Sequence, residues 1–257
     1  YKERSDVTFF VQAALECGGP VLEVGCGTGR VLIPIARAGI EITGLDLAES
    51  MLAVCRERLA AEPPQVQSRV RLVQADMRNF DLTSQGATHF GSALHLPPYT
   101  LVTLPFRPFQ HLLTVEDQLA CLACLHRHLA ADGRLVLDLF NPSFAFLASD
   151  TLGQELGQEP EFAMPDGRRV TRRSKIVARD YFTQVNQVEL IYYVTHPDGR
   201  TERLVHPFPM RYLFRYEAEH LLARAGFTVE QLYADYARSP YGAKYPGELI
   251  FVAKKVL

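Results

Sequence analysis

The amino-acid sequence predicts an α/β protein: a doubly wound, mostly parallel sheet of seven strands with a small antiparallel β insertion. Strand and helix patterns alternate from the N-terminus to Pro142, which is typical of a parallel sheet covered by helices on both faces. The pattern changes to consecutive β-rich runs over residues 168–214, and a helix followed by strands returns from residue 216. These observations predict one domain made of residues 1–142 and 216–257, with residues 143–215 inserted into it.

The first part of the chain contains the elements expected of such a sheet. Residues 5–17 carry Val7, Phe10 and Val11 at helical spacing and predict an amphipathic helix. Pro63-Pro64 separates the helix predicted over 49–61 from the strand that follows. Strands are expected at 21–25, 40–46, 69–74, 99–104 and 134–140, and further helices at 29–38, 49–61 and 116–130. A ligand is expected beyond the carboxyl ends of these strands.

The insertion is expected to form a small antiparallel sheet. Three β-rich runs cover residues 168–183, 184–195 and 201–215. The last two are joined by His196-Pro197-Asp198-Gly199, and Pro-Asp-Gly favours a turn because each residue suits one turn position. The parallel-sheet domain then resumes with a helix at 216–225, ended by Gly226, and strands near 227–235 and 248–254.

The run from Val21 to Arg30 predicts a short buried strand, a glycine-rich turn and the start of a helix. Glycine tolerates positive φ and lets a ligand approach the backbone, while the first N–H groups of a helix can bind a polar group. A dinucleotide site would need G-x-G-x-x-G, but the glycines fall at 25, 27 and 29, and Arg30 follows. Glu23 would repel a pyrophosphate and attract a cationic amine. The turn therefore disfavours a dinucleotide.

Glu23-x-Gly25-x-Gly27-x-Gly29 closely resembles motif I of the class I S-adenosylmethionine-dependent methyltransferases. Further pieces of the family pattern follow in order: Asp46 ends the second strand, Asp76-Met77 end the third, and residues 133–142 match the fifth. The resemblance covers about residues 18–142 well and 216–257 more loosely. It implies a Rossmann-like methyltransferase fold, S-adenosylmethionine as the cofactor, and methyl transfer to nitrogen or oxygen of a small molecule.

The resemblance also implies which residues bind the cofactor. Asp46 is expected to accept hydrogen bonds from both ribose hydroxyls, and Asp76 and Met77 to contact the adenine. Tyr1, with Arg4 near it, matches an N-terminal segment that folds over the cofactor in many relatives. The other expected cofactor contacts are Glu23, Gly25, Cys26, Gly27, Leu47, Met51 and Leu104.

The candidate catalytic base is His111, in a segment that resembles the family's Phe-x-x-Phe-Gln-His-Leu loop after the fourth strand. A histidine pKa suits proton transfer, although His111 could instead only close the loop. Arg107 could bind an anionic substrate or be a surface arginine. The expected substrate contacts are Phe106, Arg107, Phe109 and Tyr212. The loop over 105–111 and the inserted sheet are expected to face each other across the methyl group, because both leave the carboxyl ends of strands.

A second motif, Leu96-Pro97-Pro98-Tyr99, resembles the Asn/Asp-Pro-Pro-Tyr of enzymes that methylate amide or base amino groups. Its leucine cannot accept a hydrogen bond from a target nitrogen, and the motif precedes the predicted fourth strand. Residues 83–98 are therefore interpreted as an extra loop. In the insertion, small-molecule relatives such as sugar N-methyltransferases and glycine N-methyltransferase carry a similar sheet, which implies a lid or a dimerisation surface.

The composition of the chain limits which partners it can bind and in which cellular compartment it is expected. The chain has 257 residues and a net charge of −2, which gives no electrostatic case for nucleic acid binding. No apolar stretch reaches the length of a membrane span. Five irregularly spaced cysteines do not suggest a disulfide framework, and Cys121-x-x-Cys124 lies in a helical pattern where small apolar side chains are expected rather than a metal site. The sequence predicts a cytoplasmic protein, as a monomer or homodimer.

Three other functions remain open from the sequence. A non-catalytic member could bind S-adenosylmethionine as a regulatory or partner subunit, because no residue identified in the sequence is indispensable for catalysis. An oxidoreductase would share only the sheet architecture. A methyltransferase acting on protein or nucleic acid is disfavoured by the charge balance and by the insertion.

Overall fold

The computed structural model describes residues 5–82, 98–157 and 159–256. The predictions for Tyr1, for Arg4 and for residues 83–97 lie outside these described residues. The chain divides into two compact units. The main unit comprises residues up to Phe109, Thr114–Asn141 and the chain from Phe214, whereas the inserted unit comprises Pro142–Leu213 together with Gln110–Leu113.

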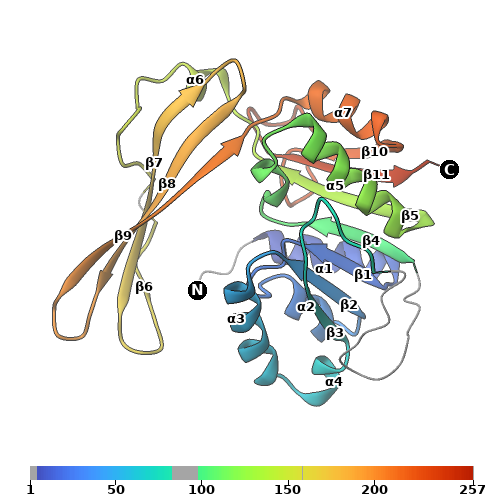
Figure 1. The fold of residues 1–257 in the computed structure, drawn as a ribbon, viewed down its shortest axis with the longest axis horizontal. Coiled ribbons are helices and arrows are strands. Elements are labelled where there is room, and N and C mark those ends of the chain that lie inside the picture. Colours follow the sequence, from blue (N-terminus) through green and yellow to red (C-terminus); the bar gives the residue numbers. More distant parts are fainter. Residues whose placement is uncertain (1–4, 83–97, 158, 257) are drawn as a thin grey trace. The chain divides into compact units, whose positions relative to one another are not determined.

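The main unit is built on a seven-stranded sheet with the order β10-β11-β5-β4-β1-β2-β3 (Figure 1). All neighbouring strands are parallel except β11, which runs antiparallel to both β5 and β10. This architecture confirms the predicted fold class. The strands are β1 (Val21–Val24), β2 (Ile42–Asp46), β3 (Val70–Gln74), β4 (Tyr99–Leu104), β5 (Leu129–Leu139), β10 (Phe227–Tyr233) and β11 (Leu249–Lys255).

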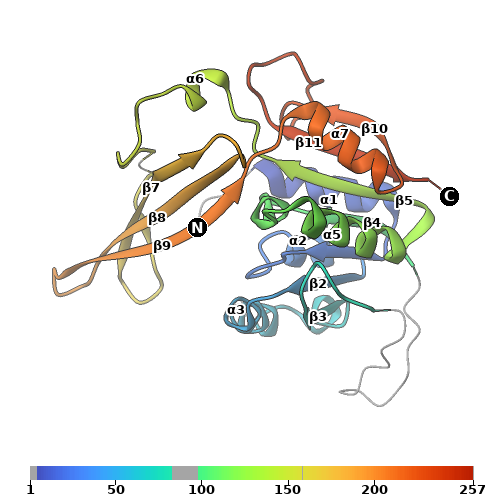
Figure 2. The same cartoon turned by 45° about the horizontal axis from the view of Figure 1, so that its top comes forward.

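Helices cover both faces of this sheet. Apolar side chains of α1, α2, α3 and α4 pack in one core cluster with Val21, Leu101 and Val136 of the sheet. Leu22 and Leu135 point to the opposite face and are also fully buried, where α5 and α7 lie against β5 and β10 (Figure 2). The helices are α1 (Ser5–Cys17), α2 (Leu32–Arg37), α3 (Glu49–Ala60), α4 (Pro64–Gln67), α5 (Val115–His128) and α7 (Arg215–Arg224), with the short 3-10 helix η1 (Pro108–His111) after β4.

The inserted unit contains a four-stranded antiparallel sheet with the order β6-β7-β8-β9. The turn between β8 and β9 forms as predicted, because the His196 N–H donates to Arg200 O at 2.8 Å and Gly199 adopts a φ of 86°. The elements are the short helix α6 (Phe144–Leu147) and the strands β6 (Phe162–Ala163), β7 (Arg169–Asp180), β8 (Val185–Thr195) and β9 (Thr201–Arg211).

The structure corrects several predicted boundaries. The fifth strand begins at Leu129 instead of residue 134, because Asp132-Gly133 reads as a turn in the sequence but lies inside β5. The inserted sheet has a fourth strand, the two-residue β6. The one-turn helices α4, α6 and η1 were not predicted, since four residues are too few to establish a helical period.

Candidate active site

The glycine turn lies between β1 and α2, at the carboxyl edge of the sheet. Gly25, Gly27 and Gly29 adopt φ values of 73°, 53° and 78°, in the left-handed region that favours glycine. The N–H groups of Gly25 and Cys26 donate to Leu45 O at 2.7 and 3.1 Å, which ties the turn to the end of β2. A Cβ on Gly25 would lie 2.7 Å from the Cβ of Pro108. The turn therefore has no room for a side chain where η1 approaches it.

Asp46, the last residue of β2, is held against this turn. Its Oδ2 accepts the Gly27 N–H at 2.7 Å and its Oδ1 accepts the Ala48 N–H at 2.9 Å. A carboxylate has about four acceptor sites in total, so each oxygen retains acceptor capacity for a ligand hydroxyl. Leu47 and Met51, which follow Asp46, are both solvent exposed. The structure thus brings together the predicted Gly27, Asp46, Leu47 and Met51 at one edge of the sheet.

Glu23 is buried in β1, two residues before the turn. Burial raises the pKa of this carboxyl to about 8, with the positive charge of Arg30 opposing the rise. Its Oε2 has no hydrogen-bond partner in the part of the chain that the structure describes. Thr103 lies opposite Glu23 in the register of β1 and β4, and its buried Oγ1 likewise has no partner among the described residues. Unsatisfied buried polar atoms are destabilising, so this position fits a cationic ligand group.

Arg30 joins the turn to α1. Its two Nη atoms donate to both carboxylate oxygens of Asp6 at 2.8 and 2.7 Å, and Asp6 is almost fully buried. The Arg30 guanidinium also lies 5.5 Å from the ring centroid of Phe106, within the range of a cation–π contact. The chain segments around the turn are therefore linked by a partly buried ion pair and by a cation–π contact.

Asp76 and Met77 follow β3 at the same edge. The Asp76 carboxylate accepts from the backbone N–H of Arg78 at 2.9 Å and from its Nη2 at 2.6 Å. These bonds hold the pKa of Asp76 below its usual value. Met77 is half-buried. The side chain of Asp76 is thus already paired with its neighbour, and its contact with adenine stays a prediction.

Two other predicted cofactor contacts are buried. Cys26 has almost no exposed surface, and burial raises the pKa of its thiol. Leu104 is fully buried at the end of β4. Their side chains belong to the core, so a ligand contact at these positions would involve the backbone.

The loop after β4, residues 105–107, carries two of the predicted substrate contacts. Phe106 is exposed, whereas Arg107 is half-buried and donates to Glu248 Oε2 at 2.6 Å. The Arg107 guanidinium also lies 5.3 Å from the ring centroid of Phe140. The interpretation of Arg107 as a plain surface arginine is therefore wrong, and its charge is already paired with a carboxylate. Phe109 is fully buried.

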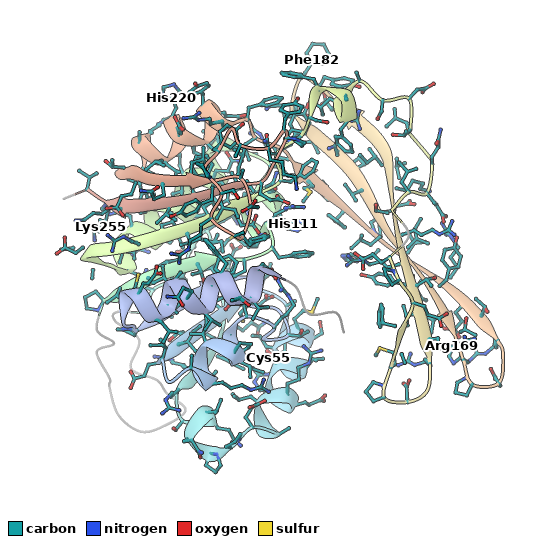
Figure 3. All side chains as sticks on the ribbon, turned by 180° about the vertical axis from the view of Figure 1, so that it is seen from behind. Cys55, His111, Arg169, Phe182, His220 and Lys255 are labelled. Carbon is teal, nitrogen blue, oxygen red and sulfur yellow. The ribbon has the colours of Figure 1, made fainter. Side chains whose placement is uncertain are left out.

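His111 ends η1 and is grouped with the inserted unit; its side chain is labelled in Figure 3. Its ring centroid lies 5.3 Å from that of Phe208 on β9. Partial removal of the imidazole from water lowers the pKa of His111, and the nearby His206 lowers it further. The Pro209 carbonyl opposes this decrease by accepting a hydrogen bond from the ring. The residue nevertheless remains solvent exposed. Tyr212 is buried, and its backbone N–H donates to Gln184 O at 3.0 Å.

This geometry agrees with comparisons to known proteins. A family model described as a methyltransferase domain matches residues 22–135. A putative methyltransferase of Bacillus subtilis (strain 168) is 24% identical over 249 residues, which is 96% of this chain and 89% of that protein. The dTDP-3-amino-3,4,6-trideoxy-alpha-D-glucopyranose N,N-dimethyltransferase of Streptomyces venezuelae is 27% identical over 236 residues, covering 90% of this chain and 84% of that protein. The solved structure of the CcbJ methyltransferase from Streptomyces caelestis has a TM-score of 0.75, 24% identity, and covers 99% of this chain and 97% of its own.

These findings support a class I S-adenosylmethionine-dependent methyltransferase, because residues 22–135 match a methyltransferase domain and the similar proteins are methyltransferases. The Glu23 oxygen without a partner among the described residues and the glycine-rich turn fit S-adenosylmethionine, because its amino acid part carries an ammonium group. Acceptor capacity on Asp46 fits the two hydroxyls of its ribose.

Four polar residues that lie around the glycine turn and the loop after β4 were not singled out from the sequence: Asp6, Arg30, Thr103 and Asp138. Asp138, near the end of β5, is fully buried and lies in the run Leu-Val-Leu-Asp-Leu. A charged residue inside an apolar strand was the available signal, the same one that marks Glu23 in Val-Leu-Glu-Val. Asp6 and Arg30 form their pair across 24 residues of sequence, and no local pattern indicates such a partner.

The described residues contain neither a helix long and apolar enough to cross a membrane nor a group of three His, Cys, Asp or Glu side chains placed to hold a metal ion. Cys121 and Cys124 are buried in α5, and Cys124 Sγ lies 3.4 Å from Arg78 O. All five cysteines are free thiols.

Proposed function

We propose that this methyltransferase transfers the methyl group of S-adenosylmethionine to an amino nitrogen of a small molecule. The observation that carries the cofactor assignment is the buried Glu23 oxygen without a partner among the described residues, beside a glycine turn held by Asp46. The choice of nitrogen is supported by the Streptomyces venezuelae relative, whose name gives an amino sugar as its substrate. An amino sugar or a similar polar amine is the acceptor class that we infer for this chain.

Each cofactor contact has a physical role in this proposal. Glu23 attracts the ammonium group, and Asp46 accepts hydrogen bonds from the ribose hydroxyls. Asp76 and Met77 bind the adenine, and the exposed Leu47 and Met51 cover the nucleoside. Backbone groups of Gly25, Cys26, Gly27 and Leu104 approach the amino acid part of the cofactor.

Methyl transfer requires the protein mainly to align the acceptor nitrogen with the methyl group and the sulfur, and to remove a proton from the acceptor. The sulfonium supplies an electrophilic methyl group and leaves as a neutral thioether, so the acceptor nitrogen attacks in line with the breaking bond. We infer that His111 accepts the proton that the acceptor releases. Its lowered pKa keeps the imidazole neutral near pH 7, and its hydrogen bond to Pro209 O makes the other ring nitrogen the acceptor.

The acceptor is proposed to contact Phe106, Phe109, Arg107 and Tyr212 in addition to His111. Mostly apolar surroundings with a few polar groups are typical of small-molecule sites. The structure pairs Arg107 with Glu248, so an anionic group on the acceptor would have to compete with this carboxylate. This favours a neutral or cationic acceptor.

Calorimetry and an acceptor screen test the proposal. We expect S-adenosylmethionine and S-adenosylhomocysteine to bind in the micromolar range, and methyl transfer to at least one amine in a panel of amino sugars, other amines and hydroxylated metabolites. A His111→Gln variant should retain cofactor affinity and lose most of its kcat. Binding without turnover of any acceptor would leave a regulatory subunit instead, and methylation of hydroxyls alone would replace nitrogen by oxygen as the target.

We also propose a cytoplasmic location, which the free thiols support because reducing compartments keep cysteines unpaired. A monomer or a homodimer is the proposed assembly. Light scattering on the purified protein measures the molar mass directly, and a value other than one or two chains of 28.9 kDa would contradict it.

A further inference from the structure

Asp138 is a buried carboxylate that the proposed chemistry does not use. It has no exposed surface, and both of its hydrogen bonds are made by one oxygen: Oδ2 accepts the Phe106 N–H at 3.0 Å and the Tyr236 hydroxyl at 2.7 Å. Its Oδ1 has no partner within the described ranges. A buried carboxylate is destabilising unless its hydrogen bonds compensate. Its bond to a backbone N–H of the loop after β4 points to a role in that loop.

The loop after β4 adopts a backbone that needs such support. Phe106 and Arg107 have φ values of 65° and 68°, two consecutive non-glycine residues in the left-handed region. This conformation is unfavourable for L-residues and persists only where surrounding contacts enforce it. Asp138 holds the first of the pair through its backbone, and Glu248 and Phe140 hold the second through its side chain.

The next residue, Pro108, lies against the glycine turn, since a Cβ on Gly25 would approach it to 2.7 Å. The loop is therefore fixed at its start by β5 and at its end by close contact with the turn. Its conformation decides which groups stand beside the glycine turn, where the proposed function places the amino acid part of the cofactor.

A closed circuit of side-chain contacts in the main unit begins and ends at Asp138. Tyr236 packs its ring edge-on against Phe9 of α1 at 5.9 Å. The same helix carries Asp6, which pairs with Arg30, and Arg30 lies over the ring of Phe106. This circuit of contacts thus connects α1 to the glycine turn, the turn to the loop after β4, and the loop back to α1 through Asp138 and Tyr236. Asp138 is the member that contacts the loop backbone.

We propose that Asp138 is a positioning residue: through Oδ2 it holds the left-handed loop after β4 against the glycine turn, and so sets the shape of the site at the transferred methyl group. The inference rests on the proposed function for the identity of that group. The tether itself stands on the geometry alone. Because both bonds use a single oxygen, an asparagine carbonyl can accept both of them, whereas an alanine can accept neither.

Three variants test this role: Asp138→Ala, Asp138→Asn and Tyr236→Phe. The matched control is Arg134→Ala, which lies four residues before Asp138 in β5 and removes an ion pair with Glu230. The first readout is hydrogen–deuterium exchange of the Phe106 amide, with and without S-adenosylhomocysteine. The second is the ratio of the affinities for S-adenosylmethionine and S-adenosylhomocysteine, which differ only by the methyl group and its charge.

We expect exchange at Phe106 to be at least tenfold faster in Asp138→Ala, and its S-adenosylmethionine affinity to fall at least fivefold more than its S-adenosylhomocysteine affinity. Asp138→Asn should stay within twofold of the wild type in both readouts, and Tyr236→Phe, which keeps the tether, should be intermediate. Arg134→Ala should change only the melting temperature. If Asp138→Ala does not fold, Asp138→Asn and Tyr236→Phe still compare the contributions of the two hydrogen bonds, from the Phe106 N–H and from the Tyr236 hydroxyl, to the exchange rate and to the affinity ratio.

Two results would overturn the proposal. Unchanged Phe106 exchange in Asp138→Ala would mean that the loop keeps its conformation without the tether. A defect in Asp138→Asn as large as that of Asp138→Ala would mean that the negative charge matters, not the acceptor oxygen. Failure of the proposed function has a different signature, namely no cofactor binding by the wild type. The exchange experiment on the free protein would then still decide whether Asp138 holds the loop.

Discussion

Glu23 lies buried in β1, an interior strand of the main sheet, where an apolar side chain would be expected. Its carboxyl has a pKa raised to about 8 by burial, so the folded protein binds a proton more tightly there than the unfolded chain does. The stabilising effect is complete below the ordinary pKa of a glutamate and is lost as the pH rises toward 8. Glu23 therefore destabilises the free protein at neutral and alkaline pH, in a position that suits a cationic ligand.

Glu23→Gln should consequently stabilise the free protein and weaken cofactor binding. We expect the melting temperature at pH 8 to rise by about 2–4 °C or more, as about 1 kcal/mol would produce in a domain of this size, with little change at pH 5. S-adenosylmethionine affinity should fall at least tenfold. Scanning calorimetry at both pH values and titration calorimetry measure the two effects. Glu41→Gln, at an exposed position before β2, is the control, and a destabilised Glu23→Gln at pH 8 would contradict the argument.

Asp46 holds the glycine turn and, in the proposed function, also binds the ribose of the cofactor. Charge-assisted hydrogen bonds contribute about 1.5–3 kcal/mol, so Asp46→Ala should weaken S-adenosylmethionine binding roughly ten- to hundredfold. The variant also frees the N–H groups of Gly27 and Ala48, so we expect a lower melting temperature as well. Asp76→Ala should have a milder effect on affinity. Unchanged affinity in folded Asp46→Ala would remove Asp46 from the cofactor site.

The sequence was enough to place Glu23, the glycines and Asp46 at the carboxyl edge of the sheet, because each belongs to a short motif with fixed spacing at a strand end; their contacts with the cofactor stay predictions. It was not enough for Thr103 or Asp138, whose roles come from facing β1 and the loop after β4. Nor does any spacing indicate that the Arg107 charge is paired with Glu248 across 141 residues. Local patterns identify groups that act with their neighbours, whereas partners distant in sequence depend on the fold.

At the scale of whole elements, the contact between the glycine turn and η1 leaves no room for an added side-chain atom. Gly25→Ala would combine a strained φ of 73° with a Cβ only 2.7 Å from Pro108, and should displace η1 or the turn. Gly39→Ala introduces comparable strain at a φ of 94° with nothing within 4 Å. We expect Gly25→Ala to lose detectable S-adenosylmethionine binding, and Gly39→Ala to lower the melting temperature only. Equal affinities of the two variants would show that the contact has no role in binding.

The end of α5 holds the chain after β3 through a buried histidine. His128 Nδ1 donates to Cys124 O at 2.7 Å, its Nε2 accepts the Leu82 N–H at 2.9 Å, and its ring stacks on Phe80 at 4.5 Å. Burial lowers the pKa of His128, with Arg127 acting in the same direction. The neutral ring thus stabilises the fold above its ordinary pKa, and that stability is lost as the pH falls through the lowered pKa.

A pH series of melting temperatures tests this connection. Between pH 7.5 and 5.5 the wild type should lose more stability than His128→Gln, in which the amide oxygen can accept the Leu82 N–H without titrating. His220→Gln, at an exposed position on α7 (Figure 3), should follow the wild type throughout. Parallel curves for all three proteins would exclude His128 as the titrating group.

Long elements were predictable because their periodicity extends over several turns or a whole strand. The helix over 5–17 and the strand over 99–104 have the bounds that the sequence predicts. The short pieces were not, because α4, α6 and β6 have no period of their own and form where neighbouring elements hold them. The start of β5 was missed for a related reason: Asp132-Gly133 has the composition of a turn, and its pairing in the sheet overrides that preference.

At the scale of the whole molecule, the two units differ in how much apolar surface they bury. Four strands with few buried apolar side chains do not form an independent core. The inserted unit also includes Gln110–Leu113, a short segment that lies far from its other residues in the sequence. Gln110 donates to Arg211 O at 2.9 Å, and Arg211 donates to Leu113 O at 3.1 Å. The buried apolar side chains described in the inserted unit are Leu112, Leu147, Val170, Ile191, Val194, Tyr212 and Leu213.

We therefore expect the two units to unfold in one transition. Gln110–Leu113 is continuous at both ends with the main unit, so unfolding of β4 and α5 would release it and take its hydrogen bonds from the inserted sheet. The chain has no tryptophan, so a single Tyr192→Trp on β8 reports on the inserted unit and a single Tyr233→Trp on β10 on the main unit. Coincident melting curves from the two variants are the expected result.

Adding ligand makes the test sharper. S-adenosylhomocysteine at about 100 times its dissociation constant should stabilise the folded protein by about 2.7 kcal/mol, which corresponds to a rise of about 5–10 °C in melting temperature. If the units are coupled, both tryptophans report the same rise although the proposed cofactor contacts lie in the main unit. A shift seen by Tyr233→Trp and not by Tyr192→Trp would mean that the inserted sheet folds on its own. The hydrogen bonds between Gln110–Leu113 and the inserted sheet would then contribute little to the stability of that sheet.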